Sequence, residues 1–261
     1  MIFLFERYRK GRYFDVIRTI VIVVFIVLYI IITLPFLLIC YLLGIFGRKL
    51  RRSSSLFFIK IWSRAVLFLC GAKITVKGKE NIIKDEAVLF VVNHRSLLDI
   101  PVFLSCTPKP AGFIAKIELA KIPVFNLWMI CLGCLFINRS KRKKGIKTIE
   151  KGTEMIRAGD SMFVFPEGTR AQTEQMGKFK AGSLRLTEES GCPVIPVALI
   201  NTDSLYEYNG HKLGKAKCGI VFGEPLRYEE LSDEIKKNYA EYIKSKIQDM
   251  LDTEVNNVIR E

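Results

Sequence analysis

A histidine and an aspartate five positions apart are the residues of this chain best suited to proton-transfer chemistry. His94 is one of only two histidines among the 261 residues, and Asp99 follows it. An imidazole can take up a proton near neutral pH, and a carboxylate on one ring nitrogen leaves the other nitrogen facing a substrate. We therefore expect His94 to act as a general base that Asp99 orients.

The same residues also allow a structural interpretation. Ser96 and Asp99 have the spacing of a capping box, so Ser96 could cap a helix whose first turn carries Asp99. A histidine at the end of a strand can also do no more than satisfy local backbone groups. The pair by itself therefore leaves both catalysis and helix capping open.

A buried strand and a helix would position this pair. Residues 86–92 contain an apolar run rich in β-branched side chains, which predicts a buried strand that ends just before Asn93 and His94. Residues 97–104 predict a helix that continues from the turn. Because ligands of α/β sheets bind at the carboxyl ends of the strands, His94 lies where a substrate is expected.

The chain beyond residue 71 alternates between strand and helix patterns. Strands are predicted at residues 73–77, 134–138, 161–165, 194–200 and 217–222, with a short apolar stretch at 111–115. Helices are predicted at residues 125–131, from 141, at 178–190 and in one long segment that Ser232 caps. This alternation predicts an α/β fold for residues 71–261, with a mostly parallel or mixed sheet flanked by helices.

Three further stretches follow the His94 turn along the chain, and with it they form a set. The four stretches are Asn93-His94-x-x-x-x-Asp99, Phe136-Ile137-Asn138-Arg139, Phe165-Pro166-Glu167-Gly168-Thr169-Arg170 and Val194-Ile195-Pro196-Val197. In this order they resemble the four motifs of the glycerolipid acyltransferase family, most closely those of bacterial 1-acylglycerol-3-phosphate acyltransferases. The resemblance runs from about residue 76 to residue 225.

This resemblance implies a fold like that of glycerol-3-phosphate acyltransferases and a specific reaction. An acyl group would pass from an acyl thioester, acyl-CoA or acyl-carrier protein, to the 2-hydroxyl of 1-acylglycerol 3-phosphate (lysophosphatidic acid), giving phosphatidic acid. The chain has no Gly-x-Ser-x-Gly elbow, and Ser96 suits a capping role. We therefore expect direct attack by the acceptor hydroxyl without an acyl-enzyme, and no cofactor beyond the acyl donor.

The phosphate of such an acceptor requires fixed positive charge, which arginine supplies as a planar fork. Arg139 and Arg170 end two of the motifs, and the resemblance assigns them to the glycerophosphate and places Lys116 near the phosphate. Glu167 is expected to accept a hydrogen bond from a glycerol hydroxyl or to hold Arg170. The full set of expected substrate-binding residues is Asn93, Ser96, Lys116, Arg139, Glu167, Gly168, Thr169 and Arg170.

The fourth motif contains no side chain that could take part in the reaction. Val194, Ile195 and Pro196 are apolar, so we expect them to form a wall for the acyl chain. The same chemistry with another acceptor, such as glycerol 3-phosphate, a lysophospholipid or a lyso-aminolipid, remains an alternative. A further alternative is an inactive lipid-binding scaffold that retains the fold.

Residues 1–70 have the composition of a membrane anchor. Residues 19–47 carry no charge, and 29 helical residues exceed the length needed for a hydrocarbon core of about 30 Å. Basic residues flank this stretch on both sides and Pro35 lies near its centre, so a spanning helix and a re-entrant hairpin both remain open. Residues 56–69 predict an interfacial helix. We expect an integral or monotopic protein on the cytoplasmic face of the cell membrane.

The net charge of +14 indicates an anionic partner. An anionic phospholipid surface fits because the basic residues alternate with apolar segments of bilayer length, and no nucleic-acid recognition motif is present. The seven cysteines show no disulfide framework. Cys131 and Cys134 have the spacing of a zinc or redox motif, yet no second pair completes a site, so no metal is expected.

Overall fold

The computed structural model describes residues 2–171, 173 and 175–260. Within these residues a seven-stranded sheet has the order β1-β7-β6-β2-β5-β3-β4. Its strands are β1 (Lys73–Lys77), β2 (Leu89–Val92), β3 (Gly112–Lys116), β4 (Leu135–Ile137), β5 (Met162–Val164), β6 (Val194–Ile200) and β7 (Lys217–Phe222). The helices are α1 (Ile2–Ile32), α2 (Leu34–Phe46), α3 (Arg48–Cys70), α4 (Asp99–Cys106), α5 (Phe125–Leu132), α6 (Arg142–Arg157), α7 (Ala181–Ser190), α8 (Asp233–Lys237) and α9 (Tyr239–Arg260).

The sheet is mixed, as predicted. Strands β6, β2, β5, β3 and β4 run parallel to one another, whereas β7 is antiparallel to β6 and β1 is parallel to β7. Because five neighbouring strands share one direction, their carboxyl ends meet at the same edge of the sheet. This edge therefore gathers His94 after β2, Lys116 at the end of β3, Arg139 after β4 and Glu167 after β5.

Helices cover both faces of the sheet, and alternate strand residues point into two cores. On one face, Phe90 packs with residues of α3, α4 and α5, and its ring lies 5.2 Å from that of Phe103. On the other face, the neighbouring residues Leu89 and Val91 pack with α7 and α9. Strands buried on both faces read as continuous apolar runs, which is why the sequence indicated them.

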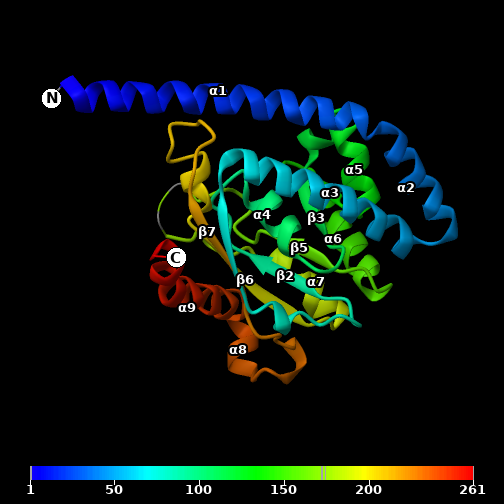
Figure 1. The fold of residues 1–261 in the computed structure, drawn as a ribbon. Coiled ribbons are helices and arrows are strands. Elements are labelled where there is room, and N and C mark those ends of the chain that lie inside the picture. The colour runs from blue at the N-terminus through cyan, green and yellow to red at the C-terminus, as the bar shows by residue number, and fades with distance from the viewer. Residues whose placement is uncertain (1, 172, 174, 261) are drawn as a thin grey trace.

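The helices before the sheet divide differently from the predicted stretch 19–47. Helix α1 ends at Ile32, and α2 starts at Leu34 with Pro35 in its first turn, where proline is tolerated. Figure 1 shows α1 along one side of the molecule, with α2 turning away from its end and α3 returning beneath it. Two segments, Phe14–Ile32 and Arg48–Cys70, are long and apolar enough to cross a membrane.

Helix α3 is fixed to the sheet by a buried ion pair. The guanidinium of Arg52 lies 2.5 Å from the carboxylate of Asp160, and it also donates to the carbonyls of Leu132 and Ser161, both at 2.8 Å. Burial lowers the pKa of Arg52, and the nearby Asp160 opposes that shift. Several α3 residues, including Leu56 and Val66, belong to the same core as the sheet.

Some element boundaries differ from the prediction. Strand β2 begins at Leu89 rather than at residue 86, and the long C-terminal segment consists of two helices, α8 and α9. Ser232 does cap α8, because its side-chain oxygen accepts a hydrogen bond from the amide of Ile235 at 3.4 Å.

Candidate active site

Asn93 fixes the end of β2 next to its neighbour β6. Its side-chain oxygen accepts from the amide of Leu199 at 2.7 Å, and its side-chain nitrogen donates to the carbonyl of the same residue at 3.0 Å. The side chain is fully buried. Asn93 thus completes the sheet where strand pairing ends, and its role in substrate binding stays a prediction.

His94 and Asp99 meet as predicted. Nδ1 of His94 lies 2.8 Å from Oδ2 of Asp99, and the same oxygen accepts from the amides of Arg95 at 2.7 Å and Ser96 at 2.8 Å. The other oxygen accepts from the hydroxyl of Thr202 at 2.5 Å. A carboxylate that only accepts hydrogen bonds favours the tautomer with its proton on Nδ1, which leaves the lone pair on Nε2.

An aromatic ring packs against the face of the His94 imidazole. The ring of Phe165 stacks on that of His94, with centroids 4.0 Å apart and planes inclined by 19°. Phe165 directly follows β5, the strand next to β2. The stacked ring and the Asp99 carboxylate together fix the plane of the imidazole. The His94 side chain remains 17% exposed.

Glu167 connects the loops that follow β2 and β5. Its carboxylate accepts from the amide of His94 at 2.8 Å through one oxygen and from the amide of Gly177 at 2.8 Å through the other. The side chain is buried, and no hydrogen bond to Arg170 is found in the described part of the chain. Glu167 therefore holds the backbone of the loop that carries His94. Arg170 pairs with Glu207 instead, and the expected contact of Glu167 with a glycerol hydroxyl stays a prediction.

Gly168 forms the turn that follows. Its φ of +75° lies in the left-handed region, and a Cβ there would lie 2.7 Å from Nζ of Lys180. The guanidinium of Arg139 donates to the carbonyl of Gly168. Thr169 is exposed in the same turn, so the glycine shapes the segment that presents Thr169 and Arg170.

Arg170 lies on the surface of the site and pairs with a residue that the sequence did not indicate. Its Nη1 donates to Oε1 of Glu207 at 2.7 Å. Glu207 also accepts from the hydroxyl of Ser96 at 2.7 Å and from the amide of Leu97 at 2.9 Å.

Ser96 does not cap α4, which corrects our sequence-based interpretation. The residue that precedes the helix is Leu98, and Ser96 accepts from the amide of Leu98 at 3.1 Å instead. Its buried hydroxyl donates to Glu207 and accepts from the amide of Leu98, and its contact with substrate stays a prediction.

The sequence of this chain is similar to those of several acyltransferases. A family model described as Acyltransferase matches residues 73–200. The 1-acyl-sn-glycerol-3-phosphate acyltransferase of Borreliella burgdorferi is 31% identical over 187 residues, which cover 72% of this chain and 75% of that protein. A probable 1-acyl-sn-glycerol-3-phosphate acyltransferase of Mycoplasma pneumoniae is 31% identical over 212 residues, or 71% of this chain and 79% of that protein. The chain belongs to the acyltransferase family.

The fold of this acyltransferase is also similar to that of a solved relative. The crystal structure of the 1-acyl-sn-glycerophosphate (LPA) acyltransferase PlsC from Thermotoga maritima matches it with a TM-score of 0.78 and 26% identity. The match covers 92% of this chain and 96% of that chain, so it includes helices that precede the sheet. The predicted family and fold class are confirmed.

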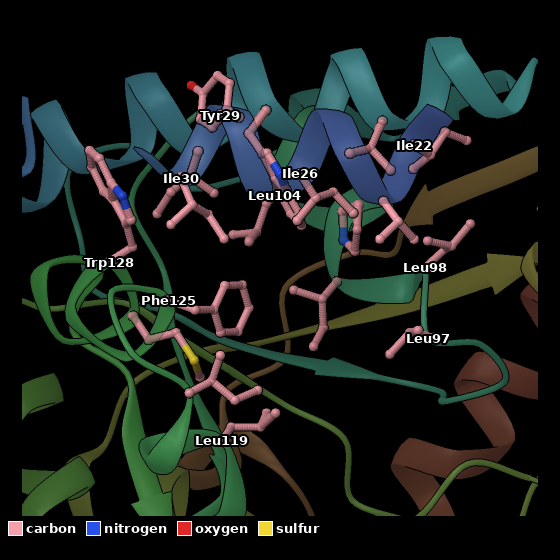
Figure 2. A pocket seen from close by; sticks show the side chains of 18 of the residues that line it. Ile22, Ile26, Tyr29, Ile30, Leu97, Leu98, Leu104, Leu119, Phe125 and Trp128 are labelled. Atoms are coloured by element: carbon pink, nitrogen blue, oxygen red, sulfur yellow. The ribbon is translucent and has the colours of Figure 1, made fainter. Parts of the chain in front are cut away.

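An apolar cavity lies beside the catalytic loop of the acyltransferase. It has a volume of about 530 Å³, and its walls come from α1, α3, α4, α5 and residues 206–213. Figure 2 shows Ile22, Ile26 and Ile30 of α1 facing Leu98 and Phe125 across this space. Leu97 and Leu98, which follow His94 in the same loop, form part of the cavity wall.

The fourth motif lies elsewhere. Val194, Ile195 and Pro196 are the first three residues of the buried strand β6, where Val194 packs into one core and Ile195 into the other. None of the three lines the apolar cavity, and their expected contact with an acyl chain stays a prediction. A strand paired on both sides turns its side chains into the two cores of the protein, and the motif supports the strand that carries His94.

Three residues of the site, Thr202, Phe165 and Glu207, were not predicted as such from the sequence. Phe165 lies in a recognised motif, but its ring contact depends on the spacing between β2 and β5. Thr202 and Glu207 follow β6 by a few residues, and that position at the carboxyl edge was the only available signal. In the described residues there is no cluster of three or more His, Cys, Asp or Glu side chains suited to a metal ion.

Proposed function

We propose that this acyltransferase transfers an acyl group from an acyl thioester to the 2-hydroxyl of 1-acylglycerol 3-phosphate, producing phosphatidic acid and a free thiol. The relatives named above support the choice of acceptor. The observation that carries the proposal is the contact of 2.8 Å between His94 and Asp99 at a sheet edge that also presents Arg139 and Arg170.

The reaction follows from the free nitrogen of His94. Nε2 removes the proton of the acceptor hydroxyl while its oxygen attacks the thioester carbonyl carbon, which forms a new C–O bond and a tetrahedral oxyanion. Collapse of this intermediate breaks the C–S bond. The imidazolium then returns its proton to the departing thiolate, so His94 ends the cycle neutral.

Direct attack by the acceptor is supported by the surroundings of the nearest hydroxyl. Ser96 is buried, donates to Glu207 and accepts from Leu98, so it is not aligned with His94 as a nucleophile. The base and its orienting carboxylate therefore act on a hydroxyl that the substrate supplies.

The phosphate of the acceptor would bind to the cations of the carboxyl edge, which are Lys116, Arg139 and Arg170. Partial burial lowers the pKa of Arg139, an effect that Glu118 opposes, but a guanidinium stays protonated at neutral pH. Such a fixed charge in a partly dehydrated position binds a phosphate more strongly than one in open water.

The acyl chain would enter the apolar cavity between α1 and the sheet domain. Helix α1 also presents apolar side chains to the outside, among them Val23 and Val27, each about half exposed. This surface supports a membrane location in which α1 and α2 embed in the cytoplasmic leaflet, with basic residues at the start of α3 facing anionic headgroups. A lysolipid could then reach His94 without leaving the bilayer.

An acceptor and donor panel tests this proposal. Purified full-length protein receives acyl-CoA or acyl-carrier protein together with lysophosphatidic acid, glycerol 3-phosphate, lysophosphatidylcholine or 1-monoacylglycerol, and thiol release is recorded. We expect the highest kcat/KM with lysophosphatidic acid and a large loss with 1-monoacylglycerol, which lacks the phosphate. Faster turnover of another acceptor, or no thiol release with any, would contradict the proposal.

A further inference from the structure

The carboxylate of Glu207 connects two parts of the site that are far apart in the sequence. It accepts from the Arg170 guanidinium at 2.7 Å, from the Ser96 hydroxyl at 2.7 Å and from the Leu97 amide at 2.9 Å. Ser96 and Leu97 belong to the loop that carries His94. Glu207 thereby joins the arginine after β5 to the loop after β2.

Arg170 needs such support because its side chain is mobile by nature. An arginine side chain loses about 2 kcal/mol of conformational entropy when it is fixed, and this one is 45% exposed. Glu207 is more strongly held, because its side chain is only 20% exposed and two further donors fix it. The ordered carboxylate thus restrains the guanidinium before a ligand arrives, which lowers the entropy lost on binding.

We propose that Glu207 is a positioning residue that sets the distance between the phosphate-binding guanidinium of Arg170 and the base His94. This inference rests on the proposed function, because it assigns Arg170 to the acceptor phosphate. The reacting hydroxyl and the phosphate are carried by adjacent carbons of the glycerol unit, so the distance between them is short and limited. A carboxylate that holds both Arg170 and the His94 loop therefore places the hydroxyl at the imidazole once the phosphate is bound.

The segment that carries Glu207 is itself anchored on both sides. Before it, Asp203 pairs with Arg95 of the catalytic loop at 2.6 Å. After it, Asn209 donates to Asp15 of α1 at 3.4 Å, and the amide of Leu213 donates to the hydroxyl of Thr19 at 3.0 Å. These contacts keep Glu207 in place between α1 and the site.

A double-mutant cycle with Arg170 tests the role of Glu207. Glu207→Ala should lower kcat/KM for lysophosphatidic acid roughly 10- to 100-fold, mainly through a higher KM, because hydrogen bonds to a charged group are lost. In an Arg170→Ala background the same change should have little further effect. Glu207→Gln keeps an acceptor oxygen for Leu97 and should fall between the parent and the alanine variant.

Glu254→Ala serves as the matched control. Glu254 lies on α9, its side chain is also 20% exposed, and it forms an ion pair with Lys77 at 2.6 Å. Its removal should leave KM close to the parent value. Effects of Glu207→Ala and Arg170→Ala that multiply, or an unchanged KM in Glu207→Ala, would overturn the proposed role. If the alanine variant fails to fold, the glutamine variant supplies the cycle.

Binding of sn-glycerol 3-phosphate, measured by calorimetry on the same full-length variants, separates the two proposals. If the parent binds this ligand but does not turn over lysophosphatidic acid, only the proposed function is refuted. The role of Glu207 is then still tested by the double-mutant cycle measured as the Kd of sn-glycerol 3-phosphate. If the parent turns over lysophosphatidic acid but the effects of the two substitutions on KM and Kd multiply, only the role of Glu207 is refuted. A parent that neither binds nor turns over overturns both.

Discussion

The hydroxyl of Thr202 donates a hydrogen bond of 2.5 Å to Oδ1 of Asp99, the carboxylate that holds His94. Thr202 follows β6 and lies fully buried. Thr202→Val keeps the shape but leaves one oxygen of Asp99 without this donor. We expect kcat to fall roughly 10- to 100-fold, with Thr202→Ser close to the parent. An unchanged kcat in the valine variant would show that the contact does not support the base.

The turn at Gly168 gives a second prediction. Gly168→Ala would force a side chain into the left-handed region, which costs about 1–2 kcal/mol, and would displace Lys180. Thermal unfolding should show this loss, and KM for the acceptor should rise because Arg139 and Arg170 flank the turn. Gly182→Ala in α7, where a Cβ meets nothing within 4 Å, should be neutral or slightly stabilising. Equal behaviour of the two variants would contradict the argument.

The buried pair of Arg52 and Asp160 predicts a large effect on stability. Asp160→Asn would leave the Arg52 guanidinium buried without its counter-charge, which typically costs about 3–5 kcal/mol. Urea unfolding in detergent measures this difference, with Asp249→Asn on the exposed face of α9 as the control. A loss no larger than that of the control would mean that α3 is held by apolar packing alone.

A surface ion pair predicts a pH dependence of stability. Arg227 donates to both oxygens of Glu86, at 3.0 and 2.7 Å, and these hydrogen bonds lower the pKa of Glu86. Because the pKa of Glu86 is lower in the folded state, the ion pair stabilises the fold at pH values above the ordinary pKa of glutamate. This contribution is lost as the pH falls through the lowered pKa. Arg227→Gln should therefore be slightly less stable than the parent at neutral pH, and the difference should shrink in acid. A difference that grows in acid would contradict this assignment.

Most strands were accessible from the sequence because burial on both faces leaves a strong local signal, whereas their order in the sheet was not predicted. Residues 194–200 and 217–222 match β6 and β7. The split of residues 19–47 into α1 and α2 was less accessible, since Pro35 is compatible with both a kink and a helix start.

A contact within the site was predictable where one motif contains both of the residues that form it. His94 and Asp99 are five residues apart, so their contact depends on one turn. The bonds of Glu167 to the amides of His94 and Gly177 were not predicted, because they depend on how two loops meet. Glu207 lies 37 residues from Arg170, and no local pattern connects the two.

The most direct test of the account is the rate of thiol release by His94→Gln with lysophosphatidic acid and an acyl thioester. Loss of a general base typically removes about 10²- to 10⁴-fold of rate, and we predict a fall of this size in kcat with the thermal unfolding temperature unchanged. A folded His94→Gln variant that releases thiol at the parent rate would contradict the assignment of His94 as the base.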